Sequence, residues 1–473
     1  MKILITNVVM LNTGDAAILM GLMDILKKAF GPNVEFVIYD SKPEVASKYY
    51  PELTFRRWVY LDRRKFRQLG GWSDRLQQFN QNYVLFAAWC WTHGLKQITK
   101  ALLSPNELKA LMDYASADLI VSTGGTYLVE NYSLEKRIFD FQFSLLLKRP
   151  LMLFTQSLGP FTNPVYKTEL QKIFDDAALI LLRDRASLKH LEEINVNTQN
   201  SHVSSDAAFA LAQPEAIQTP QPVPKHSHLK VAISSREWSH FKHIDSKFGM
   251  HKYRESLSKA TQYLVEKHGA EITFLSTCQG IPEYWTDDAK TGEVVAAMLP
   301  DSVRQNVQVD HQFRPPEALL EHLKNYDFVI ATRMHMAILA LSAGTPVLPI
   351  AYEFKTCELF ERLQLGKWVH DIELIEPEEF TQSVESFIQA IPEIRQTLAV
   401  GVIKEQQQAM AAGRSPNKHW SNDAMWNFFK SLVGWASCPS KSSRQDASST
   451  GNQGFQNFSC TSLCDSKIWG GKP

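Results

Sequence analysis

The chain alternates short apolar runs with amphipathic helical patterns, and this alternation constrains its fold more than any other feature of the sequence. In the first half the predicted strands are residues 2–9, 34–39, 118–122, 151–155 and 179–182. Helical patterns such as 15–30 and 133–148 separate them. Alternation of this kind favours parallel sheets with crossover helices on their faces.

The pattern restarts after a proline-rich segment. Residues 213–229 contain four prolines and few large apolar side chains, which is typical of an interdomain linker. The next predicted strands are 230–234, 271–276, 306–310, 327–331 and 346–350, again separated by helical patterns, among them 284–299. We therefore predict an α/β protein with two doubly wound, Rossmann-like domains, residues 1–212 and 230–433. A ligand cleft is expected between them, at the carboxyl ends of the strands.

Two segments do not fit this pattern. Residues 434–473 include a stretch rich in Ser, Gly, Gln and Asn, and we expect a disordered tail. Residues 55–104 form a basic, aromatic-rich helical insertion, in which arginines such as Arg63 and Arg64 precede the sequence YVLFAAWCW at 83–91. One interpretation is a helix packed on its own domain with solvated arginines. The other is peripheral membrane contact through residues 56–95.

Composition excludes several classes of function. Fifty Lys and Arg balance fifty Asp and Glu, so no global charge favours a nucleic-acid partner. Six scattered cysteines form neither a disulfide framework nor a zinc pattern. The apolar start reads as a first strand rather than a signal peptide, and no run reaches the roughly 18 apolar residues of a membrane span. We expect a cytoplasmic protein, at most peripheral at the inner face of a membrane, with no metal and no cofactor.

In the first domain, small and polar residues follow predicted strands. Asp15 opens the first helix after Gly14, where free backbone N–H groups favour an anion, although Asp15 would also serve as a simple helix cap. Gly124 and Gly125 follow the strand at 118–122, where paired glycines permit close ligand contact or an ordinary turn.

Two further motifs mark the same predicted rim. Gln156 and Ser157 end the next strand, and Arg183 ends the one after it, in the sequence Arg-Asp-Arg. The carboxyl ends of neighbouring parallel strands line the edge where open α/β sheets bind ligands. An Arg-Asp-Arg turn is equally typical of an internal salt-bridged corner, so this motif leaves both interpretations open.

The second domain carries a sharper signal. Thr332 can cap the helix that follows the strand at 327–331, which would place Arg333 and His335 in its first turn. There a guanidinium, an imidazole and free N–H groups can converge on one anion. Arg236 and Lys355 follow neighbouring strands and should reach the same rim, although Lys355 with Glu353 could equally form an exposed ion pair.

Taken in order, these motifs resemble the polysaccharide pyruvyl transferase family. The matching set is Gly14-Asp15-Ala-Ala-Ile-Leu, Gly124-Gly125, Gln156-Ser157-x-Gly159-Pro160, Arg183-Asp184-x-x-Ser187, Asp206-x-x-Phe209-x-Leu211, Ser235-Arg236, Arg333-x-His335 and Tyr352-x-x-Lys355. The resemblance runs over about residues 1–390, the insertion excepted. It implies a fold similar to two-domain GT-B glycosyltransferases. It also implies transfer of pyruvate from phosphoenolpyruvate to two hydroxyls of a saccharide, as a ketal in an exopolysaccharide or cell-surface glycan precursor.

The resemblance also implies roles for residues. The first domain would bind the saccharide acceptor, for which a lipid-linked form would suit a membrane contact, and the second would bind phosphoenolpyruvate. His335 is the candidate acid, because imidazole holds a transferable proton near neutral pH, and Asp15 would orient or deprotonate an acceptor hydroxyl. The predicted substrate-binding residues are Arg236, Arg333, Met334, Lys355, Gly124, Gly125, Gln156, Ser157 and Arg183. Two alternatives stay open: a GT-B-type glycosyltransferase that uses a nucleotide sugar, and a catalytically silent homologue.

Overall fold

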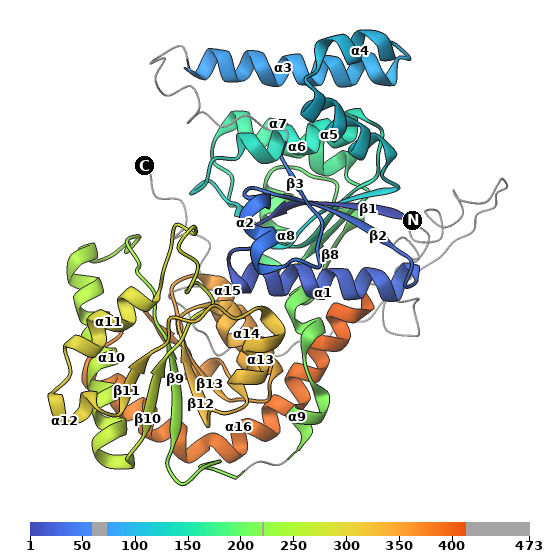
Figure 1. The fold of residues 1–473 in the computed structure, drawn as a ribbon. Helices are drawn as coiled ribbons and strands as arrows, with labels where there is room; N and C mark the ends of the chain where they lie inside the picture. Colours follow the sequence, from blue (N-terminus) through green and yellow to red (C-terminus); the bar gives the residue numbers. More distant parts are fainter. Residues whose placement is uncertain (59–72, 220–221, 413–473) are drawn as a thin grey trace.

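The computed structural model describes residues 1–58, 73–219 and 222–412, with the side chains of 73–80 excepted. Arg63 and Arg64 of the insertion and the predicted disordered tail at 434–473 lie outside these ranges. The described chain forms two α/β units, each built on one parallel sheet, so the predicted fold class is confirmed (Figure 1).

The first sheet is entirely parallel. Its strands are β1 (Lys2–Val8), β2 (Glu35–Asp40), β3 (Phe55–Arg57), β4 (Leu119–Ser122), β5 (Gly125–Leu128), β6 (Leu151–Leu158), β7 (Leu179–Leu182) and β8 (Ser201–Val203). Their order is β3-β2-β1-β4-β6-β7-β8, and β5 pairs with the far end of β6. All five predicted strands are present. Strands β3 and β8 have only three residues each, and β5 begins with a glycine and is only partly buried, so the sequence did not predict these three.

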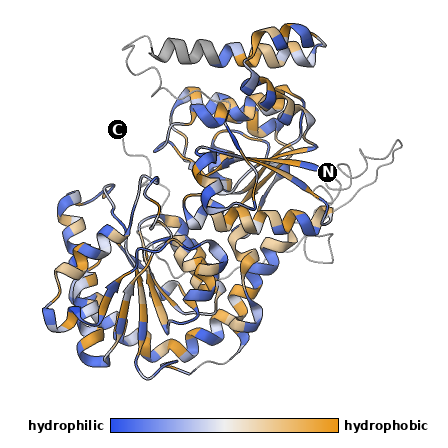
Figure 2. Ribbon diagram, in the orientation of Figure 1, coloured by the Kyte–Doolittle hydropathy of each residue, from blue (hydrophilic) through white to orange (hydrophobic). Residues whose placement is uncertain are grey.

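The second sheet is also parallel, in the order β11-β10-β9-β12-β13-β14. Its strands are β9 (Lys230–Ser234), β10 (Glu271–Phe274), β11 (Val307–Val309), β12 (Phe328–Ala331), β13 (Val347–Ala351) and β14 (His370–Asp371). In Figure 2 the strands of both sheets are mostly hydrophobic and the outer helices are largely hydrophilic. That distribution is what parallel sheets covered on both faces require.

The helices fill the crossovers. In the first unit they are α1 (Thr13–Phe30), α2 (Pro43–Tyr49), α3 (Ser73–Thr92), α4 (Lys96–Leu102), α5 (Pro105–Ser116), α6 (Glu135–Leu146), α7 (Pro164–Asp176) and α8 (Arg185–Glu193). The later ones are α9 (Pro214–Gln218), α10 (Ser246–His268), α11 (Ala289–Ala297), α12 (Asp301–Arg304), α13 (Pro316–Leu323), α14 (Met334–Ser342), α15 (Phe354–Arg362) and α16 (Pro377–Ala411). Among them, no helix of the described residues is long and apolar enough to cross a membrane.

Two sequence expectations near the cleft are wrong. Thr332 does not cap α14, because its hydroxyl is hydrogen-bonded to the Tyr253 hydroxyl of α10 at 2.8 Å; Arg333 occupies the cap position instead. The helix expected at 284–299 begins only at Ala289, so Tyr284 and Trp285 stand in a loop. At Thr332 a tertiary hydrogen bond replaces the predicted helix cap. At 284–288 the chain forms a loop where the local pattern predicted a helix.

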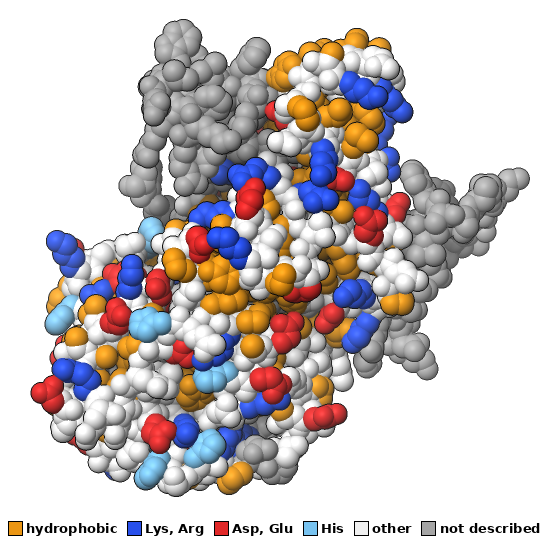
Figure 3. All heavy atoms as spheres, in the orientation of Figure 1, with side chains coloured by type: hydrophobic (Ala, Val, Ile, Leu, Met, Phe, Trp, Pro, Cys, Tyr) orange, Lys and Arg blue, Asp and Glu red, His pale blue; other side chains and the backbone are white. Residues whose placement is uncertain are grey.

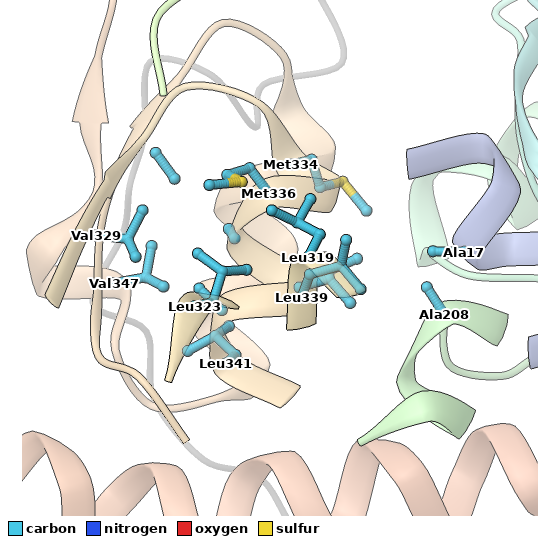
Figure 4. Close-up of a cluster of buried hydrophobic side chains, with 14 of the residues drawn as sticks. Ala17, Ala208, Leu319, Leu323, Val329, Met334, Met336, Leu339, Leu341 and Val347 are labelled. Carbon is cyan, nitrogen blue, oxygen red and sulfur yellow. The ribbon is translucent and has the colours of Figure 1, made fainter. Parts of the chain in front are cut away.

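The two units pack against each other through small side chains of the first unit and larger apolar side chains of the second. Helix α1 and the short 3₁₀ helix η3 (Ala207–Leu211) lie against α13 and α14. Figure 4 shows Ala17 of α1 and Ala208 of η3 beside Leu319 and Leu339 of those helices. Helix α16 also contacts both η3 and α10, so it ties the units together. The segment predicted as a linker, 213–229, contains α9, and its boundaries as a linker stay a prediction.

Candidate active site

A cleft of about 320 Å³ lies between the carboxyl ends of the two sheets. The loops after β1 and β4 form one wall, and the loops after β9, β10, β12 and β13 form the other. This volume falls within the range of small-ligand sites. The cleft therefore lies where the sequence placed it, at the strand ends that face each other.

Gly14 lets the two walls approach each other at the start of α1. A Cβ at this position would stand 2.6 Å from Cβ of His335, closer than real side-chain atoms come. Asn12, not Asp15, caps the helix: its Oδ1 accepts a hydrogen bond from the Gly14 N–H. Asp15 is thereby released from capping and lies in the first turn of α1, on the cleft wall.

The pKa of Asp15 is raised by burial, although His335, Arg183 and other cations act in the opposite direction. A carboxyl group with a raised pKa can exchange a proton closer to neutral pH than an ordinary aspartate. Burial also raises the pKa of the nearby Cys278 thiol to about 12, so this cysteine lines the cleft as a neutral thiol and not as a thiolate nucleophile.

Arg333 is anchored by a carboxylate. Its Nε and Nη2 donate to the two oxygens of Asp288 at 2.8 and 2.7 Å, in a bidentate pair. Asp288 is buried and also accepts a hydrogen bond from Ser276 at 2.5 Å. The guanidinium lines the cleft in a fixed orientation. Its Nη1 has no hydrogen-bond partner among the described residues.

Arg236 is held by aromatic rings. Its guanidinium carbon lies 4.1 Å from the ring centroid of Tyr352 and 4.8 Å from that of Trp238. Its side chain donates a hydrogen bond to the Glu237 carbonyl, at 3.3 Å. Among the described residues, no carboxylate forms an ion pair with it. Ring contacts therefore fix the Arg236 guanidinium in the cleft wall, without a direct carboxylate partner in the described chain.

Lys355 bridges the two walls. Its Nζ donates to Thr126 of β5 at 2.9 Å and forms an ion pair with Glu353. Burial alone would lower the pKa of Lys355, but Glu353 raises it above its usual value, so the ammonium stays charged. The ion pair considered for these residues is present; it lies in the cleft wall, with both side chains mostly buried.

His335 lies on a buried ion pair. Its Nε2 is 3.4 Å from Oδ2 of Asp206 and 3.4 Å from Nη1 of Arg183. Arg183 is itself paired with Asp206, and both side chains are 2% exposed. Burial alone would raise the pKa of Asp206, but Arg183 and His335 hold it well below its usual range. Asp206 is therefore ionised, and the Arg183–Asp206 pair fixes the position of the His335 ring at the cleft.

Seven of the predicted site residues line the cleft together, and four do not. The seven are Asp15, Gly124, Arg236, Arg333, Met334, His335 and Lys355. Gln156 and Ser157 are fully buried, because β6 continues through them to Leu158 and does not end at 155. Ser157 accepts from Arg183 Nε at 2.8 Å, so the Arg-Asp-Arg turn is an internal corner behind the wall. Gly125 lies at the start of β5 with φ 150°. The functional roles of all eleven predicted site residues stay predictions.

Sequence reasoning assigned no role to several residues of the site. Asp206 stood in the quoted motif set and could have been singled out there. Asp288, Tyr284 and Trp285 come from the irregular loop after β10, which carries no periodic signal. Arg137, on α6, lines the cleft and donates to Asn7 Oδ1 at 2.6 Å. Nothing in its sequence context marks it as different from a solvated arginine.

Positive charge predominates along the cleft. Five basic side chains line it, against two carboxylates: Arg137, Arg236, Arg333, His335 and Lys355, against Asp15 and Glu353. An excess of this kind favours a small polyanion, above all one with carboxylate or phosphate groups that arginine contacts bidentately. No group of three or more potential metal ligands occurs within the part of the chain that the structure describes.

Comparisons with known proteins identify similar sequences. The sequence profile of the polysaccharide pyruvyl transferase family matches residues 12–353. The amylovoran biosynthesis protein AmsJ of Erwinia amylovora is 27% identical over 322 residues, which cover 65% of this chain and 74% of that protein.

Similar solved structures show the architecture alone. A glycosyltransferase from Rickettsia africae superposes with a TM-score of 0.54 at 9% identity, over 91% of this chain and 98% of its own. HepE of Anabaena, solved with UDP-glucose, gives 0.50 at 13% identity, over 92% of this chain and 99% of its own. At such identities the likeness establishes a GT-B-like fold.

Proposed function

Because the chain belongs to the polysaccharide pyruvyl transferase family, we propose that it transfers the enolpyruvyl group of phosphoenolpyruvate to two hydroxyls of a saccharide, as a ketal. The observation that carries this proposal is the cationic cleft. Phosphoenolpyruvate carries a carboxylate and a phosphate on a small carbon frame, and both groups suit fixed guanidinium donors.

Within the cleft, Arg236 is the first candidate for an anion ligand, since it has no carboxylate partner among the described residues. Arg333 would add a second contact through Nη1 while Asp288 holds the rest of its guanidinium. Lys355 would add a point charge, since its Nζ lies 5.9 Å from the centroid of the Tyr352 ring that Arg236 also contacts. These cations would neutralise the phosphate as it leaves.

The reaction requires proton transfers to carbon and from both acceptor hydroxyls. A proton adds to the methylene carbon of phosphoenolpyruvate, and a saccharide hydroxyl forms a C–O bond at the adjacent carbon. The C–O bond to phosphate then breaks, and a second hydroxyl of the same saccharide completes the ketal. Of the two hydroxyl protons released, one balances the proton taken up at the methylene carbon and the other is carried away on inorganic phosphate.

His335 is assigned the role of acid, because its imidazole lines the cleft and an imidazole can transfer a proton near neutral pH. Asp15 lies in the adjacent first turn of α1 and is assigned the role of base toward an acceptor hydroxyl. Its raised pKa makes it a stronger base than an ordinary aspartate once it is ionised. Asp15 and His335 thus place a base and an acid on opposite walls of one cleft.

Replacing Arg236 with alanine should weaken phosphoenolpyruvate binding by about 1.5–3 kcal/mol, because a charge-assisted contact is lost. Arg236→Lys should recover little, since an ammonium reproduces neither the fork nor the stacking between Tyr352 and Trp238. Isothermal titration calorimetry with phosphoenolpyruvate measures both effects. Lys247→Ala, an exposed cation on α10, is the matched control and should bind like the wild type. Equal affinity in Arg236→Ala would remove this residue from the site.

The function itself is tested by phosphorus NMR of the protein with phosphoenolpyruvate and a saccharide fraction from the producing cells. Release of inorganic phosphate that depends on the saccharide supports pyruvyl transfer. A protein that ignores phosphoenolpyruvate but releases nucleoside diphosphate from a nucleotide sugar is a glycosyltransferase. A protein that consumes neither donor corresponds to the catalytically silent homologue.

A further inference from the structure

A second chamber, of about 580 Å³, adjoins the cleft and shares part of its wall. The residues common to both are Tyr132, Arg236, Trp238, Trp285, Thr286, Arg333 and Glu353. Beyond them, the outer chamber is lined by the loop after β9 and by the first residues of α11. A small donor in the inner cleft would leave this outer chamber free for the second substrate.

Charge separates the two chambers. Counted by Arg and Lys alone, the inner cleft has four cations against two carboxylates. In the outer chamber four Arg and Lys side chains, Arg236, Arg254, Lys290 and Arg333, face four carboxylates, Glu237, Asp287, Asp288 and Glu353. Arg254, which lines the outer chamber and not the inner cleft, is paired with Glu237. A balanced wall of this kind suits an uncharged, hydroxyl-rich ligand better than a diphosphate.

An exposed tryptophan stands where the chambers meet. Trp285 is 78% exposed, although a side chain with so much apolar area is ordinarily buried. It stands beside Tyr284 in the loop after β10, and it lines both chambers. The flat face of an indole can stack on the C–H face of a pyranose ring, while His240, Asp287 and Lys290 offer polar groups to its hydroxyls.

We propose that the outer chamber is the saccharide subsite and that a hexopyranose ring stacks on Trp285. A sugar held there would present hydroxyls toward the inner cleft, since Trp285 belongs to both walls. As an acceptor subsite it rests on the function proposed above, but sugar binding at Trp285 does not depend on phosphoenolpyruvate. The two can therefore be tested apart.

The test is saturation-transfer-difference NMR of the full chain with methyl α- and β-hexopyranosides of glucose, galactose and mannose, in the absence of phosphoenolpyruvate. At least one glycoside should bind, with its ring C–H protons receiving the transfer. Trp285→Ala should weaken that binding by roughly tenfold, and Trp285→Phe should retain most of it. Phe248→Ala, which removes another exposed ring from α10, is the matched control and should change nothing.

Three results would overturn the subsite: no glycoside binds the wild type, binding is unchanged in Trp285→Ala, or UDP binds in a Trp285-dependent way while the glycosides do not. Failure of the proposed function looks different. If the glycosides bind through Trp285 but phosphoenolpyruvate is never consumed, the subsite stands and pyruvyl transfer does not.

A separate observation concerns the insertion. Helices α3 and α4 project from the outer side of the first unit, beyond α5, α6 and α7 (Figure 1). One face of α3 is packed, with Val84, Ala87 and Ala88 buried, as the packed-helix interpretation expected. The other face is apolar and exposed: Phe86 and Trp89 are 52% and 42% exposed and stack on each other at 6.0 Å.

Helix α4 continues this surface. Leu95 and Ile98 are exposed beside Lys96 and Lys100, and Figure 3 shows hydrophobic and basic side chains gathered at this end of the molecule. Residues 81–104 contain these two lysines and no Asp or Glu. Two copies of the chain that met through this surface would bring lysine against lysine. An anionic surface would instead be complementary to it.

We propose that this surface, formed by Phe86, Trp89, Leu95, Lys96, Ile98 and Lys100, binds anionic lipid bilayers. Aromatic side chains beside lysines, on a partly buried amphipathic helical pair, are typical of interfacial membrane contact. Lipid binding at this surface requires no assumption about catalysis.

Vesicle flotation tests the membrane proposal. The wild type should float with vesicles of phosphatidylcholine and phosphatidylglycerol and not with phosphatidylcholine alone. Phe86→Ser with Trp89→Ser should reduce the bound fraction roughly tenfold, and Lys96→Glu with Lys100→Glu should reduce it similarly. The matched controls, Val165→Ser and Lys247→Glu, should float like the wild type. Wild-type protein that stays unbound, or binding unaffected by both double variants, would overturn the proposal. A surface-dependent dimer without flotation would assign it to a second copy.

Discussion

Replacing His335 with alanine is expected to slow the chemical step of pyruvyl transfer by about 10²–10⁴ while phosphoenolpyruvate affinity changes little. The imidazole lies on the cleft wall, and an imidazole is suited to deliver a proton to the methylene carbon. The cations assigned to the two anionic groups of the donor are separate residues. Single-turnover kinetics combined with calorimetric titration distinguishes the two effects.

The matched control for this variant is His311→Ala. His311 is an exposed histidine of the same unit and forms an ion pair with Glu293 away from the cleft. The His311→Ala variant should leave both the rate of the chemical step and the affinity for phosphoenolpyruvate unchanged. A His335→Ala protein that keeps its circular dichroism spectrum and also keeps its rate would exclude His335 as the acid.

Replacing Arg183 with methionine should lower the free energy of unfolding by about 3–5 kcal/mol at pH 7, because it leaves the Asp206 carboxylate buried without its main counter-charge. Two further contacts are lost with it: Arg183 donates to Ser157 at 2.8 Å and to Thr126 at 2.6 Å. Urea denaturation measures the change. Arg185→Ala, two residues away and exposed, should stay within about 0.5 kcal/mol of the wild type.

The pH dependence of this destabilisation gives a second readout. In the wild type the pKa of Asp206 is held below its usual range, so the ion pair stabilises fully above the unfolded aspartate pKa and is lost as pH falls through the folded pKa. Without Arg183, burial raises the pKa of Asp206 and protonation relieves the isolated charge. The gap between variant and wild type should therefore narrow as the pH is lowered. A gap that is constant or widens would contradict the role given to this pair.

The sequence predicted the sheets well because each buried strand is a continuous apolar run, which a parallel sheet covered on both faces requires. It also predicted which strand ends would converge, because a small set of rules restricts strand order and ligand position in doubly wound folds. Asp15, Arg236, His335 and Lys355, which all line the cleft, were identified in this way, from their positions soon after strands.

The partners of those residues could not be predicted. Asp288 anchors Arg333 from an irregular loop whose helical appearance at 284–299 was misleading, and the Thr332 hydroxyl is taken by Tyr253, 79 residues earlier in the chain. The continuation of β6 beyond residue 155 buries Gln156, and this depends on pairing with β5 and β7. Such contacts arise from packing between distant segments, which local patterns do not encode.

The most direct test of the central claim is carbon NMR of the reaction with phosphoenolpyruvate labelled at its second carbon. We predict that the label moves into a saccharide-bound quaternary ketal carbon in the wild type, that inorganic phosphate forms in equal amount, and that His335→Ala forms neither at a comparable rate. Label that stays in phosphoenolpyruvate, while the saccharide is extended from a nucleotide sugar, would contradict the account.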